Sequence, residues 1–263
     1  MTETEGSLGW AQETEGYGRA REAAERSLAL EPNLAEGHVL IAAIRRNCDW
    51  DWRGAEASLA RALDLAPGNA LVLRGAAMLA HARGQLEEDI RLSHRAVEQD
   101  PLSATAYHNL GLALQGASRW AESEAAHRRA LELSPLRATV HANLALSLLA
   151  QGRGAEALAE AMRETDELFG LNVQAIVHHA IGHGAESEAA LRELIEKYAE
   201  DGAYQIAEVH GTRGEADAAF EWLERAYTQR DGGLIGLRCS SPLRSLHGDP
   251  RWSAFLKKMG LED

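Results

Sequence analysis

Residues 104–135 read ATAYHNLGLALQGASRWAESEAAHRRALELSP, and this stretch decides the fold because its features recur along the chain. Its last residue, Pro135, follows Pro67 and Pro101 at a constant spacing of 34 residues. Proline costs roughly 3 kcal/mol inside a helix, so prolines collect where helices end. A fixed period of about 20–50 residues is typical of stacked repeats. The sequence therefore predicts a repetitive helical architecture.

The slots inside the stretch have a consistent chemistry. Large residues (Tyr107, Leu110, Leu114) surround the small Gly111, and Ala130 stands before the closing proline. The position of Gly111 is occupied by Ala77 and Ala145 in the neighbouring units. The position of Ala130 is occupied by Ala62 and Ala96 in the preceding units. Small residues let two helices approach closely, and Gly84 and Gly152 suit the turns between helices because glycine tolerates a positive φ.

This pattern resembles the tetratricopeptide repeat (TPR), whose units are antiparallel helix hairpins. The resemblance implies an all-α fold: a right-handed superhelical solenoid of five to six hairpins. Asp249-Pro250 adds a capping signal for a C-terminal helix that we expect to end near Met259. Asp51 is placed to cap a helix in the same way, and Trp52 is expected to pack over a hairpin turn as Trp120 does in its own unit.

The repeat register predicts the domain organisation. We expect a flexible or atypical N-terminal segment (1–16), a TPR array (17–169), two degenerate hairpins (170–231) and a C-terminal loop with a capping helix (232–263). Within the array the units are a half-repeat and four repeats, at residues 17–32, 33–67, 69–101, 103–135 and 137–169. The half-repeat lacks its first helix, which predicts that the natural protein extends further at its N-terminus. The alternative is an unusual capping helix at a true start.

Composition excludes several classes of function. The net charge of −13 disfavours nucleic acid, which requires a basic surface, and favours a neutral or basic protein partner. The two cysteines, Cys48 and Cys239, match no metal or redox spacing, so we expect reduced thiols in a cytoplasmic protein. No apolar run approaches the ~18 residues of a membrane span, so no membrane association is expected.

Two segments carry a narrower resemblance. The first reads DWDW at Asp49–Trp52, and the second runs from AFEWLERAY at residues 219–227 to DPRW at residues 249–252. Together they resemble the C-terminal TPR arrays of large bacterial regulatory proteins, in which the array follows an adenylate-cyclase-type or winged-helix domain, often with a TolB-like segment between. The resemblance implies a regulatory or scaffolding part of a larger bacterial protein.

One group of residues suggests metal chemistry. His178, His179 and His183 are close in sequence, and the last two would lie one turn apart on a helix, which is a metal-ligand spacing. However, no glutamate stands between them as in the HExxH hydrolase motif, and packing between helices explains the same residues. We therefore expect no metal site, no cofactor and no enzyme activity, with metal binding through this cluster as a weaker alternative.

The favoured function is binding of a peptide or protein segment in the concave groove, which the first helix of each TPR hairpin lines. Equivalent groove-facing slots hold Arg74, Met78, His81, His108, Leu112, Gln115 and Leu146. Asn109 and Asn143 add side chains that both donate and accept hydrogen bonds, which suits the backbone of an extended peptide. A second hypothesis is a free-standing scaffold that self-associates through the N-terminal half-repeat as a homo-oligomer.

Overall fold

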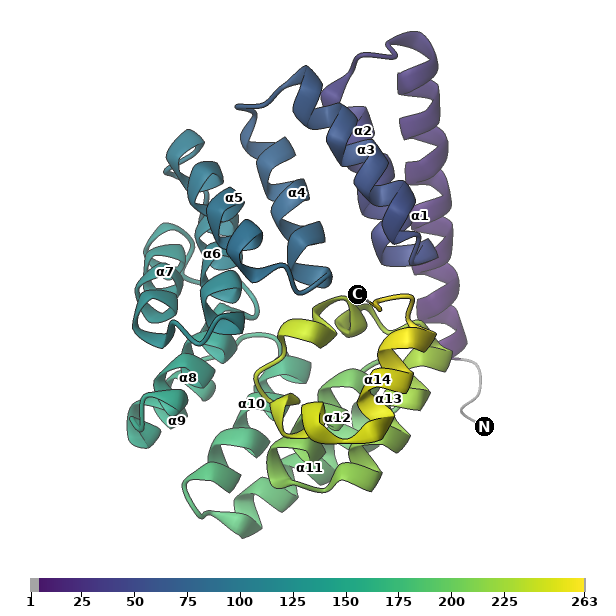
Figure 1. The fold of residues 1–263 in the computed structure, drawn as a ribbon. Helices are drawn as coiled ribbons and strands as arrows, with labels where there is room; N and C mark the ends of the chain where they lie inside the picture. The colour runs from purple at the N-terminus through teal and green to yellow at the C-terminus, as the bar shows by residue number, and fades with distance from the viewer. Residues whose placement is uncertain (1–4, 263) are drawn as a thin grey trace.

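The computed structural model describes the backbone of residues 5–262 and the side chains of residues 16–262. Residues 1–4 of the predicted N-terminal segment and residue 263 of the predicted tail lie outside the described residues. Every regular element in the described part is helical, which confirms the predicted all-α fold class. Figure 1 shows the helices stacked side by side in a strongly curved TPR-type solenoid.

Six antiparallel hairpins form the described solenoid, and a long helix, α1 (Glu5–Leu30), packs along the first of them. The first helices of the hairpins are α2 (Ala35–Ile44), α4 (Ala70–Ala82), α6 (Ala104–Gly116), α8 (Val140–Ala150), α10 (Glu167–Ala180) and α12 (Ala203–Arg213). The second helices are α3 (Trp52–Leu65), α5 (Leu86–Gln99), α7 (Trp120–Leu133), α9 (Gly154–Ala161), α11 (Gly184–Tyr198) and α13 (Ala216–Gln229). A π-helical turn (Arg45–Asp49) extends α2.

The hairpin turns repeat one backbone conformation. Gly84 and Gly152 have φ values of 69° and 76°, which confirms their predicted role. Trp50 and Ser118 occupy the same register positions with φ values of 54° and 60°. A residue with a Cβ atom is uncommon in this left-handed region, so the repeat geometry overrides local preference at these two turns.

Helix starts also follow the register. Asn69 caps α4 and Ser103 caps α6, each accepting a hydrogen bond from the first turn, and each stands two residues after one of the periodic prolines. The predicted caps are confirmed as well, because Asp51 accepts a hydrogen bond from Gly54 and Asp249 accepts one from Arg251. Such caps are worth about 1 kcal/mol each because they satisfy backbone N–H groups that have no partner in the helix.

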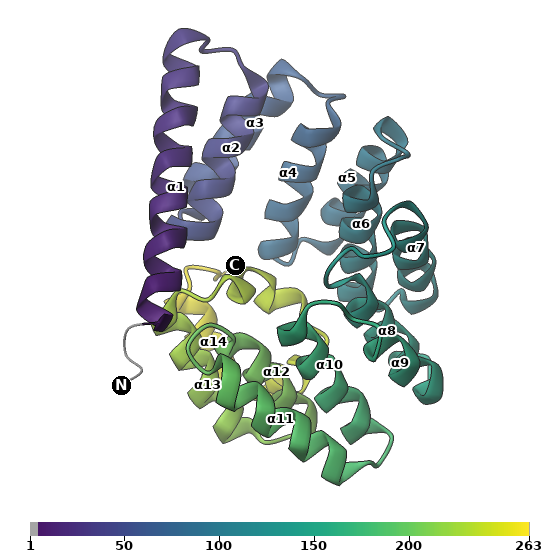
Figure 2. The same cartoon turned by 180° about the vertical axis from the view of Figure 1, so that it is seen from behind.

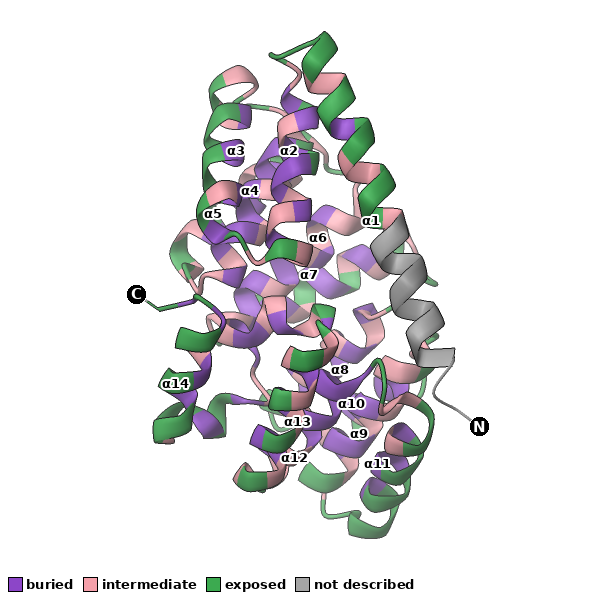
Figure 3. Cartoon of the chain, turned by 90° about the vertical axis from the view of Figure 1, so that its right-hand side faces the viewer, coloured by how far each residue is buried: buried purple, intermediate pink, exposed green. Residues whose placement is uncertain are grey.

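Small residues allow the helices to touch. Ala62, Ala96 and Ala130 are buried between neighbouring repeats. At Gly111 a Cβ atom would lie 2.3 Å from the imidazole ring of His127, so only glycine fits at this crossing. Figure 3 shows the buried residues gathered where helices face one another, while exposed residues cover the outer sides of α1, α11 and α14 (Pro250–Lys258). The predicted close approach of the helices is confirmed.

The remaining residues, 231–262, are called the C-terminal tail below. The tail comprises two 3₁₀ segments (Gly232–Cys239 and Arg244–Gly248) followed by α14. It packs against α12 and α13 and also returns to α2, α3 and α4, so one apolar core contains residues from both ends of the array. Figures 1 and 2 show the yellow tail between the N-terminal helices and α12–α13, where it bridges the two ends of the curved solenoid.

Candidate peptide-binding groove

The predicted groove residues divide between two pockets on the inner side of the solenoid. Arg74, Met78 and Asn109 line a first pocket between α2, α4 and α6, with a volume of about 280 Å³. His81, His108, Leu112, Gln115, Asn143 and Leu146 line a second pocket of about 340 Å³. The single groove expected from the repeat pattern is therefore two sites with different walls.

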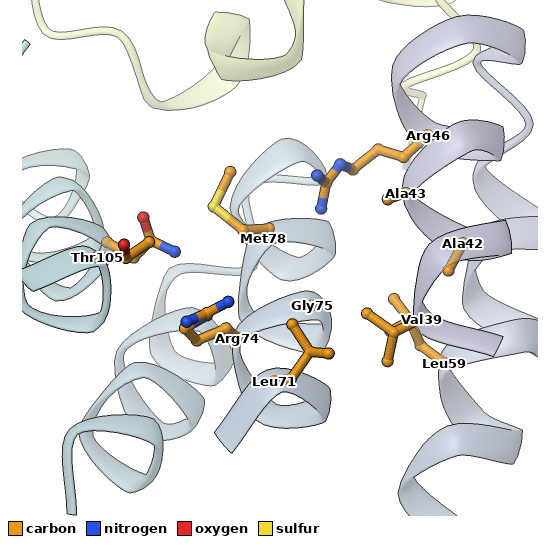
Figure 4. Close-up of a pocket in the computed structure, with 11 residues that line it drawn as sticks. Val39, Ala42, Ala43, Arg46, Leu59, Leu71, Arg74, Gly75, Met78 and Thr105 are labelled. Carbon is orange, nitrogen blue, oxygen red and sulfur yellow. The ribbon is translucent and has the colours of Figure 1, made fainter. Parts of the chain in front are cut away.

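The first pocket has an apolar floor. Val39 of α2, Leu59 of α3 and Leu71 and Met78 of α4 contribute its aliphatic walls. Gly75 keeps the helices close, because a Cβ atom there would lie 3.0 Å from Cγ1 of Val39. Figure 4 shows Arg46 extending from the α2 side toward α4, while Arg74 and Met78 project from α4 toward Thr105 on the other side of the pocket.

Arg46 is a pocket residue that the sequence analysis missed, although the register contains a signal for it. It stands 34 residues before Ala80, and the same slot holds Leu114 and Leu148. These three apolar residues are at most 4% exposed, and Arg46 is 8% exposed in the same position. Burial lowers the pKa of Arg46 to about 10, with Tyr17 opposing the shift, so the side chain remains a cation at neutral pH. A charged residue at a repeat position that is otherwise apolar is the sequence signal that could have identified Arg46.

The two asparagines differ in their hydrogen bonds. The side chain of Asn143 donates to the carbonyl of Thr139 in its own helix, at 2.8 Å. Asn109, in the first pocket, makes no hydrogen bond with another described residue through its side chain. Of the two, Asn109 therefore has its full donor and acceptor capacity available.

The C-terminal tail closes the second pocket on one side. Cys239, Ser240 and Pro242 line it opposite the groove helices. The Cys239 thiol donates to the carbonyl of His81 at 3.1 Å, and the Ser240 hydroxyl donates to Oε1 of Glu208 at 2.8 Å. The tail therefore contacts the first helices α4 and α12 directly at the second pocket.

Buried titratable groups concentrate around the second pocket. Burial raises the pKa of Glu208 to about 7, although hydrogen bonds from Ser240 and Tyr204 partly oppose the shift. Burial alone would lower the pKa of His81, but its hydrogen bonds with Asp89 (2.8 Å) and Cys239 raise the pKa to about 10. Both residues also hydrogen-bond to the tail, His81 with Cys239 and Glu208 with Ser240.

His108 lies deeper, in contact with the core. Its Nε2 is 3.2 Å from Oγ1 of Thr139, and its ring packs against that of His127, with the centroids 5.3 Å apart. Burial lowers the pKa of His108 to about 3, and burial lowers that of His127 well below its usual value. Both nitrogens of the His127 ring lack hydrogen-bond partners in the described structure.

The histidine cluster does not have the geometry predicted from the sequence. The prediction that His179 and His183 share one helix face is wrong, because α10 ends at Ala180 and the chain turns at Gly182 (φ 82°). His183 instead begins the next helix, α11, and its ring packs against His178 at 5.6 Å. Among the described residues, no group of three or more histidine, cysteine, aspartate or glutamate side chains is arranged to hold a metal ion.

The two segments that carry the narrower resemblance meet in space. The ring of Trp50 lies 5.1 Å from that of Tyr227, and the guanidinium of Arg230 lies 4.2 Å from the Trp50 centroid. Nε1 of Trp52 donates to the carbonyl of Met259 at 2.7 Å. Trp52 is 6% exposed because the tail covers it, whereas Trp120 in the equivalent slot is only half-buried. The segments form one contact that joins the ends of the solenoid.

Comparison with known proteins agrees with this architecture. Residues 108–169 match the tetratricopeptide repeat family model. No curated protein sequence matches the chain. Similar solved structures include PilW, described as a widely conserved type IV pilus biogenesis factor, with 17% identity and a TM-score of 0.63 over 75% of this chain and 92% of that chain.

Two further structures have the same fold. PilF of Pseudomonas aeruginosa shows 18% identity and a TM-score of 0.58, over 76% of this chain and 91% of that chain. A tetratricopeptide repeat protein from Parabacteroides merdae shows 15% identity and a TM-score of 0.62, over 89% and 96% of the two chains. Among the described helices, none has the length and apolar character needed to cross a membrane. The chain therefore has a TPR-type helical solenoid fold, and within it residues 108–169 match the tetratricopeptide repeat family model.

Proposed function

We propose that this protein binds a peptide or protein segment of a partner in its concave groove, as an interaction module or scaffold. The observation that carries the proposal is the first pocket, which combines aliphatic walls with polar side chains from different helices. Pockets of this composition bind ligands through apolar contact and use the polar groups for orientation. The tail closes one side of the second pocket, so the first pocket, at the N-terminal end of the groove, is the proposed docking site.

A steric block of the first pocket tests the proposal. Met78→Trp should fill the pocket without changing its charge, and we expect it to weaken binding of groove-selected peptides by about tenfold or more. Peptides would be selected by display on the full chain and measured by fluorescence anisotropy. Met162→Trp is the matched control, because Met162 lies 63% exposed at the end of α9, outside both pockets. Equal affinity of the two variants would contradict groove binding.

We also propose that the module is the regulatory or scaffolding part of a larger, cytoplasmic bacterial protein. The support is the narrower sequence resemblance, whose two segments form the contact between Trp50 and Tyr227. The coding sequence upstream of Met1 tests this idea: an open frame encoding a cyclase-type or DNA-binding domain is expected, and a stop codon directly upstream contradicts it. Self-association through the N-terminal half-repeat stays a prediction, which sedimentation at several concentrations would test.

A further inference from the structure

A buried cation that has no counter-ion among the described side chains lies in the wall of the first pocket. Nε of Arg46 donates to Oδ1 of Asn47 at 2.8 Å, and no described carboxylate forms an ion pair with its guanidinium. Burying an unpaired charge costs several kcal/mol, because the ion loses its hydration. The equivalent residues Ala80, Leu114 and Leu148 show that the repeat itself does not require a charge here. The cost of burying Arg46 therefore calls for an anionic ligand, which the described residues do not supply.

A second cation faces the same pocket from another helix. Arg74, on α4, lines the pocket and makes no ion pair with a described residue. No aspartate or glutamate lines this pocket within the described part of the chain. Arginine is well suited to carboxylates because its planar fork donates two parallel hydrogen bonds. The aliphatic side chains of Leu71 and Met78 stand beside these donors.

We propose that the first pocket binds an acidic segment of a partner peptide, with a glutamate or aspartate carboxylate between Arg46 and Arg74 and an apolar neighbour against Met78. The inference rests on the proposed groove-binding function and names the chemistry of its ligand. It reverses the preference for a neutral or basic partner expected from the net charge of −13. Both guanidiniums line the pocket, and no aspartate or glutamate does so among the described residues, so the charge of the pocket wall favours a carboxylate although the net charge is negative.

Two peptide libraries provide the test. Both contain randomised nine-residue peptides, with the central position held as glutamate in one library and glutamine in the other. Retention of each library on the immobilised full chain is measured at physiological salt. We expect the wild-type protein to retain the glutamate library about tenfold more strongly, because a hydrogen bond between charged groups outweighs a neutral one. Equal retention of the two libraries, including no retention of either, overturns the inference.

Variants separate this inference from the proposed function. Arg46→Leu and Arg74→Leu should each remove the preference for glutamate, whereas Arg53→Leu, an exposed arginine outside the pocket, should retain it.

Arg46→Leu should melt at or above the wild-type temperature, because leucine occupies this position in other repeats. A lower melting temperature would assign Arg46 a structural role and overturn the inference. If Met78→Trp blocks binding but Arg46→Leu leaves the glutamate preference intact, the groove function stands and the acidic ligand is rejected. A phosphoserine library retained more strongly than the glutamate library would replace the carboxylate with a phosphate and overturn the assignment.

Discussion

Trp52→Ala should lower the free energy of unfolding by about 3–5 kcal/mol, the usual cost of removing a large buried aromatic side chain. Trp52 belongs to the apolar core that joins α2, α3 and α4 to the tail, and its indole N–H donates to the carbonyl of Met259. The variant therefore leaves a cavity and also an unsatisfied carbonyl group at the contact between the two ends of the chain. Urea unfolding followed by circular dichroism measures the change.

Trp120→Ala is the matched control for this prediction. Trp120 occupies the same repeat slot as Trp52 and is half-buried, with the guanidinium of Arg244 at 5.5 Å from its ring. Because less of its surface is removed from water, we expect its truncation to cost less than about 2 kcal/mol. Limited proteolysis provides a second measurement, since loss of the Trp52 contact should expose the tail to cleavage. Equal costs for the two variants, with no change in proteolysis, would show that the tail contact contributes little.

Acidification should destabilise the protein through its two buried histidines. Because the pKa of His127 is lowered on folding, the unfolded chain binds a proton below about pH 6.5 that the folded chain excludes. The stability contributed by neutral His127 is thus complete above this pH and is lost as the pH falls toward the folded pKa. His108, with a pKa of about 3, acts in the same direction. Each site should contribute about 1.4 kcal/mol per pH unit.

Other titratable groups also change how the stability of the whole protein depends on pH, so a variant is needed to isolate the contribution of His127. The raised pKa of Glu208, about 7, favours the folded state as the pH falls from 7 toward 4.5 and offsets one histidine. The raised pKa of His81, about 10, is without effect here, because His81 is protonated in both states below about pH 6.

His127→Leu should separate these contributions. Its ring nitrogens have no partners to lose, so the variant should be close to wild type in stability at pH 7.5. Between pH 6 and pH 4.5 it should then gain about 2 kcal/mol relative to wild type. Chemical unfolding at each pH measures the difference. His179→Leu, at an exposed position, serves as control, and a His127→Leu profile that runs parallel to the wild type would contradict a neutral buried imidazole.

The sequence was sufficient for features that depend on neighbouring residues. The spacing of Pro67, Pro101 and Pro135 predicted the repeat, and Gly84 and Gly152 marked two of its turns, because helix ends and turns are decided by local backbone chemistry. Small residues such as Gly111 and Ala130 predicted close helix packing for a similar reason, since each repeat contacts only the next. The location of the candidate groove on the first helices followed from the same register.

Predictions from neighbouring residues were less successful where the sequence departs from the regular repeat pattern. His179 and His183 have helical spacing in the sequence, yet the turn at Gly182 separates them. Arg46 was overlooked because its neighbours carried only the second half of the repeat pattern. Its burial becomes evident only when the slot is compared with Ala80, Leu114 and Leu148.

By itself, the sequence determined a TPR-type solenoid and its closing helix, because these follow from interactions within one repeat and between adjacent repeats. The tertiary structure alone decided that Trp52 meets Met259, 207 residues away, and that residues of the tail line the second pocket. That contact depends on the rotation accumulated over all the hairpins. The small rotation between one hairpin and the next is encoded locally. The place where the two ends of the chain meet depends on the total rotation over the whole array.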